Sequence, residues 1–153
     1  MNRQRRVKVG APLVRRVVEA VFAAEEAGEP RISVALVNDE VIREVNREHL
    51  DHDWATDSIS FSYEDDPSPD GLRGEVVVSG ETALREAEER GKDPVHELLL
   101  YVAHGTLHLL GWDDDTPARR DAMNAHAAEI LAGAGITERP AGGRPTGGEG
   151  APR

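Results

Sequence analysis

The chain has 153 residues, of which 39% are hydrophobic and 31% are charged, enough for one compact domain and too few for two. Because it contains no cysteine, disulfides and thiolate metal ligands are excluded, and any metal site must use histidine and carboxylate side chains. The net charge of −11 disfavours a non-specific nucleic-acid binder, and no run approaches the roughly 18 apolar residues of a membrane helix. We therefore expect a soluble, cytoplasmic protein.

The first half of the chain alternates between helical and strand periodicity. Apolar residues repeat every three or four positions after Pro12, which predicts an amphipathic helix that ends near Gly28. A short β-branched run follows, and Asn38 or Asp39 can cap the next helix. A polar loop rich in proline and acidic residues separates two later strands. The expected elements are a helix at 12–28, strands at 31–38, 58–63 and 74–79, and a helix at 39–50.

The second half is mostly helical. A helix over residues 81–90 ends at Gly91, and Asp93-Pro94 and Thr116-Pro117 are start signals for two more helices, because proline favours the first helical turn. These helices should run to Leu110 and to about Leu131. We expect an α+β fold in which helices cover a small mixed sheet of about four strands, the last supplied by residues near Val7. Residues 1–137 would form the single domain, and residues 138–153, almost without apolar side chains, a disordered tail.

The informative segment lies at the end of the helix that precedes Gly111. His104 and His108 are four residues apart, so both imidazoles can point from one helix face toward one metal ion. Gly111 ends the helix, and the chain can then return Asp113, Asp114 or Asp115 to the same point. Two histidines and one carboxylate with a fourth position open are typical of catalytic zinc. The alternative is two ordinary helix histidines, followed by an acidic run that caps the next helix.

This segment resembles the signature of the YbeY family of bacterial endoribonucleases, His-Gly-x-Leu-His-Leu-x-Gly-Tyr-Asp-His. Here it reads His-Gly-Thr-Leu-His-Leu-Leu-Gly-Trp-Asp-Asp over residues 104–114. Three further segments are similar to family motifs and occur in the family's order: Asn46-Arg-Glu-His49, Thr56-Asp57-Ser-Ile-Ser-Phe61 and Gly74-Glu-Val-Val-Val-Ser79. Together they cover residues 31–115, and four ordered matches make coincidence improbable.

The resemblance implies a ligand set of His104, His108 and Asp114 for one zinc ion per chain. Asp114 stands where the family has its third histidine, and a carboxylate is an equally legitimate zinc ligand. Leu50 stands where the family frequently has arginine, which removes a candidate phosphate contact. His52 and Asp57 are candidates for proton transfer or positioning, although a loop histidine and a strand-entry cap explain them as well. Trp112 could stack a base or pack to fix the turn.

By the same resemblance, we expect a metal-dependent, single-strand-specific endoribonuclease. It would act in ribosomal RNA maturation at the 3′ end of 16S rRNA and in ribosome quality control, with rRNA and ribosomal particles as partners and a ribosomal protein as a further candidate. Metal-activated water or the RNA 2′-hydroxyl could each be the nucleophile.

Two other classes of protein remain open from the sequence. A zinc peptidase would need His-Glu-x-x-His, and Gly105 occupies the place of its general base. A non-catalytic assembly factor could use the metal only to stabilise its fold, and Leu50 and the net negative charge favour it modestly.

Overall fold

The computed structural model describes residues 7–50, 57–63 and 71–138, with the backbone alone at residues 49 and 50. Every helix and strand expected from periodicity within these residues is present. In chain order they are α1 (Ala11–Ala24), β1 (Ile32–Val37), α2 (Asp39–Leu50), β2 (Ser58–Ser62), β3 (Gly74–Ser79), α3 (Gly80–Arg90), α4 (Pro94–Leu109) and α5 (Pro117–Gly133).

The strands form one mixed sheet of order β1-β3-β2. β1 pairs with β3 in parallel and β2 pairs with β3 antiparallel, so the predicted α+β fold with a mixed sheet is confirmed. The described residues contain three strands rather than about four. Residues 7–10 form no strand: Val7 is 3% exposed and packs in the main core, and only three residues separate it from the start of α1 at Ala11. Residues 1–6 lie outside the described residues.

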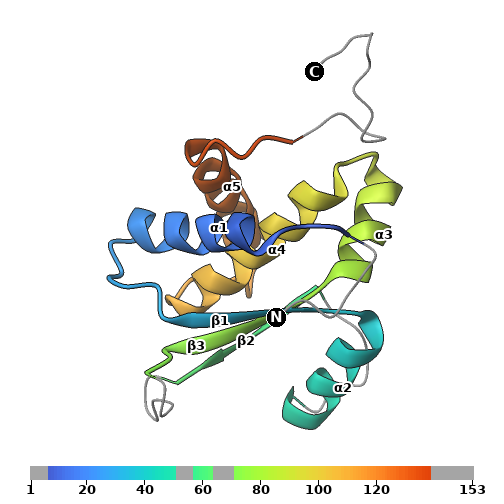
Figure 1. Ribbon diagram of the computed structural model, residues 1–153, viewed down its shortest axis with the longest axis horizontal. Coiled ribbons are helices and arrows are strands. Elements are labelled where there is room, and N and C mark those ends of the chain that lie inside the picture. The colour runs from blue at the N-terminus through green and yellow to red at the C-terminus, as the bar shows by residue number, and fades with distance from the viewer. Residues whose placement is uncertain (1–6, 51–56, 64–70, 139–153) are drawn as a thin grey trace, which may run out of the picture.

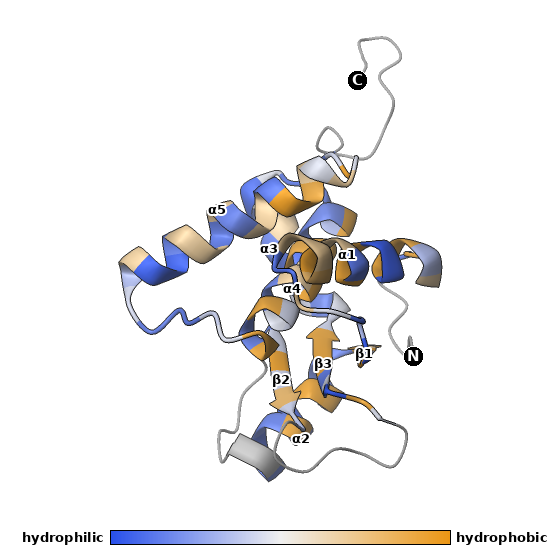
Figure 2. Ribbon diagram, turned by 90° about the vertical axis from the view of Figure 1, so that its left-hand side faces the viewer, coloured by the Kyte–Doolittle hydropathy of each residue, from blue (hydrophilic) through white to orange (hydrophobic). Residues whose placement is uncertain are grey.

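The sheet lies between two unequal helical layers, α2 on one face and the other four helices on the opposite face (Figure 1). Alternation along β3 explains both contacts, because Val76 and Val78 point into the larger core while Val77 packs against the smaller one. The smaller core contains Val37, Ile42 and Ile59. Apolar colour is concentrated on the strands between the two layers (Figure 2).

Helix α4 is the central helix and is buried along most of its length. The Asp93 carboxylate caps it by accepting from Val95 N–H at 3.1 Å, as Asp93-Pro94 predicts. Gly105 lets the helix approach the sheet closely, because a Cβ there would overlap a Val76 methyl group. Ser60 Oγ on β2 donates to the Gly105 carbonyl at 2.8 Å and so links the helix to the sheet at the same position. One end of α4 is therefore fixed on the sheet beside the two histidines.

Packing continues just past α5. Ile136 is 8% exposed and belongs to the main core, and the Asp93 N–H donates to Glu138 Oε2 at 3.3 Å. Residues 139–153, most of the predicted tail, lie outside the described residues. The boundary between a domain at 1–137 and a tail at 138–153 stays a prediction.

Candidate metal centre

His104 and His108 open into a cleft of about 870 Å³. The cleft runs between α3, α4 and α5, and Asp57, at the entry to β2, lies on its wall. Asp114, which follows α4, and Asn124, on α5, complete the polar end of the wall near the histidines. The structure therefore brings together four of the five residues predicted as ligands or catalytic groups. The fifth, His52, lies outside the described residues.

His108 is held in one orientation by the chain that follows it. Its Nδ1 lies 3.1 Å from the Trp112 carbonyl oxygen, and because a carbonyl can only accept, Nδ1 must carry a proton. In the neutral imidazole Nε2 then keeps a lone pair, and it faces Asp114 Oδ2 at 3.4 Å. A histidine whose second nitrogen is fixed by a backbone carbonyl is the usual arrangement of a metal ligand.

The turn after α4 selects one of the three consecutive aspartates. Gly111 has φ +103°, a left-handed conformation that lets the chain reverse toward His108. Asp114 then faces the imidazole, whereas Asp113 and Asp115 both lie beside Arg119, at 3.7 and 2.9 Å. This arrangement supports Asp114 as the third ligand over its neighbours.

His104 is partly buried in the wall of the cleft. Burial lowers the pKa of its imidazole and favours the neutral form that binds metal, and the charge of Asp57 and a hydrogen bond with Asn124 partly oppose this shift. Asp57 itself accepts from the Ser58 N–H at 2.7 Å. Asp57 therefore caps the entry to β2, one of the two roles that the sequence left open for it. It also lies close enough to His104 for its negative charge to favour the protonated imidazole.

The donor set fits a cation. His108 Nε2 and Asp114 Oδ2 are both acceptors with lone pairs, so their approach is favourable only when a proton or a metal ion lies between them. Within residues 7–50, 57–63 and 71–138, no three His, Asp or Glu side chains already converge in a metal-binding arrangement. The residues present are thus the right type and lie together, and His104 would have to close the set.

The rest of the cleft carries charges of both signs. Arg90 lies between Glu86 and Glu97, at 2.8 and 3.5 Å, while Lys92 and Arg120 line the wall further along. Burial and the neighbouring Glu97 carboxylate raise the pKa of Tyr101, so its hydroxyl stays protonated. Local positive charge is therefore present in the cleft of a chain that is acidic as a whole.

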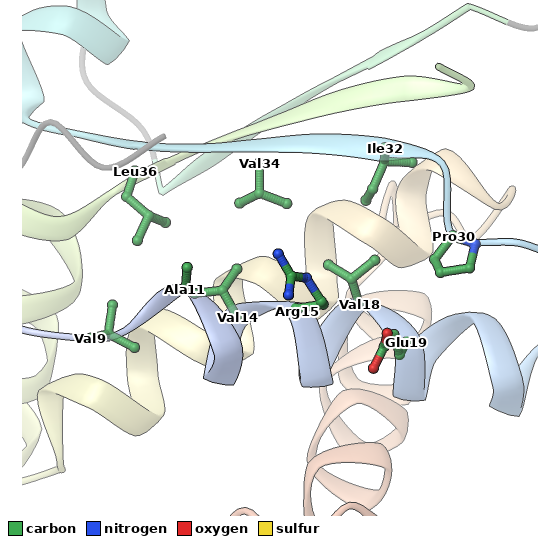
Figure 3. A pocket seen from close by; sticks show the side chains of 10 residues that line it. All are labelled: Val9, Ala11, Val14, Arg15, Val18, Glu19, Pro30, Ile32, Val34 and Leu36. Atoms are coloured by element: carbon green, nitrogen blue, oxygen red, sulfur yellow. The ribbon is translucent and has the colours of Figure 1, made fainter. Parts of the chain in front are cut away.

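A second hollow, of about 360 Å³, lies between α1 and β1 (Figure 3). Valine, leucine, isoleucine, alanine and proline line it, and Arg15 and Glu19 are its charged residues. It shares no residue with the cleft and has no histidine in its wall, so it does not belong to the site.

Sequence reasoning missed the residues that support the histidines from other elements. Asn124 on α5 contacts His104, and Glu25 and His126 both contact the Trp112 side chain. Trp112 packs, which agrees with the interpretation that it fixes the turn. Nothing in the local sequence marks these partners, because tertiary packing alone brings them together.

The fold and the site define a small α+β protein with a histidine–carboxylate site at the end of its central helix. Residues 1–135 match the profile of a family described as endoribonuclease YbeY. An endoribonuclease YbeY of Moorella thermoacetica is 40% identical over 148 residues, covering 88% of this chain and 95% of that protein. One from Rhodopirellula baltica is 45% identical over 115 residues, covering 74% of this chain and 57% of that protein.

The solution structure of a Thermotoga maritima protein has a similar fold, with a TM-score of 0.56 and 25% identity, covering 87% of this chain and 91% of that chain. The chain belongs to the endoribonuclease YbeY family. This membership confirms the predicted family and the predicted endoribonuclease, and it does not favour the non-catalytic assembly factor. No helix among the described residues is long and apolar enough to span a membrane.

Proposed function

We propose that this chain is a metal-dependent, single-strand-specific endoribonuclease of ribosomal RNA maturation, with one zinc ion held by His104, His108 and Asp114. Its place of action would be the 3′ end of 16S rRNA and ribosome quality control in the cytoplasm. The observation that carries the metal assignment is the approach of two acceptors, His108 Nε2 and Asp114 Oδ2, at 3.4 Å inside the cleft. The family and the motif at residues 104–114 support the RNA substrate.

The chain's own residues set up the reaction by position and charge. His108 is held with Nε2 toward Asp114, and burial favours the neutral form of His104, which can bind a cation without first losing a proton. When bound, zinc would polarise a phosphate oxygen and make a water molecule easier to deprotonate. Asp57, close to His104, and His52 are the groups we propose for moving or positioning the proton.

The decisive experiment measures zinc and RNA cleavage in the same preparations. The parent should hold one zinc per chain and cleave single-stranded RNA, whereas folded His108→Ala should lose the metal and the cleavage. His96→Ala is the matched control for metal content, because His96 lies on the same helix and in the same cleft but away from the ligand set. Well under one zinc per parent chain after added zinc, or full cleavage by His108→Ala, would contradict the proposal.

Ribosomal particles are the proposed physiological partner because the net charge of −11 repels free RNA. Binding to free RNA should weaken further as salt falls below physiological, since repulsion is then less screened. Cleavage of ribosomal particles and of purified rRNA at equal metal concentration measures the difference. Equal rates on both substrates would argue against delivery by the particle or a ribosomal protein.

A further inference from the structure

A second polar cluster lies behind the site, and the proposed chemistry does not use it. It consists of Glu25 at the end of α1, Trp112 in the turn after α4, and His126 on α5. Trp112 Nε1 donates to Glu25 Oε1 at 2.7 Å, and the other carboxylate oxygen lies 2.7 Å from His126 Nε2. The Trp112 and His126 rings stack, with centroids 4.5 Å apart and planes 14° from parallel.

The three side chains form a closed set of contacts. Each oxygen of Glu25 serves one ring, so neither ring can turn without breaking a hydrogen bond to a charged acceptor. Burial alone would raise the pKa of Glu25, but the hydrogen bonds from His126 and Trp112 outweigh it and hold the pKa below its usual value. Glu25 is therefore ionised near neutral pH, as both contacts require.

The cluster reaches the site through one backbone atom. The Trp112 carbonyl accepts from His108 Nδ1 at 3.1 Å. Gly111, the residue before Trp112, has φ +103°, and glycine restricts the backbone less than any other residue, so the preceding chain does little to hold this carbonyl. The backbone N–H of Trp112 donates to the Leu107 carbonyl at 3.0 Å, which fixes the peptide plane between residues 111 and 112. The Trp112 carbonyl belongs to the next peptide plane, whose orientation also depends on rotation about the Trp112 backbone. Indole and carbonyl belong to the same residue, so holding one restrains the other.

We propose that Glu25, Trp112 and His126 are positioning residues that hold the Trp112 carbonyl against His108 and so fix the imidazole in its metal-binding tautomer. The inference rests on the proposed metal site and adds to it a support drawn from α1 and α5. Such supporting contacts affect metal affinity as well as activity, because a freely turning imidazole must be ordered when the ion binds.

The test compares zinc affinity, by competition with a chromophoric chelator, between the parent and two variants that keep the shape of the cluster. Trp112→Phe retains the stacked ring and removes the indole N–H, and Glu25→Gln leaves one acceptor oxygen for two donors. Each should bind zinc about tenfold more weakly, the lower end of the range for losing a supporting contact. Unchanged affinity in both variants would overturn the proposal.

The matched control is Tyr63→Phe, which removes a part-buried hydrogen bond from an aromatic residue to the Glu75 carboxylate away from the cluster. It should lower stability about as much as Trp112→Phe and leave zinc affinity unchanged. If Tyr63→Phe weakens zinc equally, the cluster acts only through general stability and the proposal fails.

Nitrogen NMR of the metal-free protein at pH 8 separates this inference from the proposed function. The parent should show His108 as one tautomer with the proton on Nδ1, and Trp112→Phe and Glu25→Gln should show a mixture. Should the parent bind no zinc, the metal site is wrong, and this tautomer measurement still decides the role of the cluster. A single Nδ1–H tautomer in both variants would refute it.

Discussion

Two polar clusters of this protein contain an aspartate at a comparable depth, and they differ in how completely their atoms are paired. Asp39 Oδ1 accepts from Ser79 Oγ at 2.6 Å and Thr82 Oγ1 at 2.7 Å, and Oδ2 accepts from Arg85 at 2.8 Å. In the other cluster, the carboxylate of Asp114 faces Nε2 of His108, which in the neutral imidazole has no proton to donate. One cluster pairs donors with acceptors, whereas the other opposes two acceptors.

This difference indicates which cluster binds a ligand. Asp39 joins the starts of α2 and α3 to the end of β3, so its contacts stabilise the fold without any added group. Asp114 and His108 gain nothing from each other until a cation arrives. The same substitution, aspartate to asparagine, should therefore have opposite consequences in the two clusters.

The largest expected effect is on zinc binding by Asp114→Asn. The amide removes the charged ligand oxygen, and zinc affinity should fall by about 100-fold or more, since loss of a supporting contact alone costs roughly 10- to 100-fold. With His108 neutral, the metal-free variant should melt at the same temperature as the parent, because the carboxylate makes no favourable contact with the Nε2 lone pair. Chelator competition and thermal unfolding measure both, and zinc affinity equal to the parent's would remove Asp114 from the ligand set.

Gly105→Ala tests whether the packing of α4 on the sheet affects zinc binding by His108 and Asp114. The added Cβ would overlap Val76 and press Ser60 Oγ at 3.2 Å, so we expect a loss of about 1–3 kcal/mol and a melting temperature lower by several degrees. Zinc affinity should fall with it, because the helix that carries both histidines must shift. Gly133→Ala is the control: no atom lies within 4 Å of its Cβ, and stability should stay within about 0.5 kcal/mol or rise.

Asp39→Asn should lower stability without touching the metal. Hydrogen bonds to a charged group contribute about 1.5–3 kcal/mol, and the amide keeps part of this, so we expect a loss of about 1–2 kcal/mol in urea unfolding at pH 7. Zinc affinity should equal the parent's. A loss of zinc in this variant would show that the two clusters are not independent.

The smallest expected effect is the pH dependence of the stability that Asp39 contributes. The donors around Asp39, Ser79 first, outweigh the burial that raises its pKa and hold the pKa below the ordinary 3.8. Its contribution to stability is present above that value and is lost as the pH falls through the lower folded pKa. The difference in unfolding free energy between the parent and Asp39→Asn should therefore shrink below pH 3.8. A difference that stays constant with pH would mean that the charge of Asp39 is not what the cluster uses.

The sequence predicted what depends on neighbours along the chain. The start signals at Asp93-Pro94 and Thr116-Pro117 work within one helical turn, and His104 and His108 share a helix face through their spacing alone. Asp114 was separated from its neighbours only by the family motif, and the structure supports that choice through Arg119, which engages both other aspartates.

The remaining parts depend on packing between distant segments. Trp112 and Glu25 are 87 residues apart in the chain, and His126 and Glu25 are 101 apart, so no local pattern indicates these contacts. The described residues at 7–10 form no strand for a related reason: the Val7 side chain is buried in the core of α1 and its neighbours. Residues 1–6, the rest of the segment expected to supply a strand, lie outside the described residues.

Gly105 also restricts the evolution of this site. The residue immediately after His104 is the place where a zinc peptidase carries its glutamate base, so one substitution could in principle exchange one hydrolase for another. In this fold any side chain at position 105 meets Val76, because the Val76 methyl group on β3 already fills the space where a Cβ would stand. A glutamate at position 105 would therefore need a smaller side chain at position 76 as well, so core packing opposes a single-step exchange of glycine for that base.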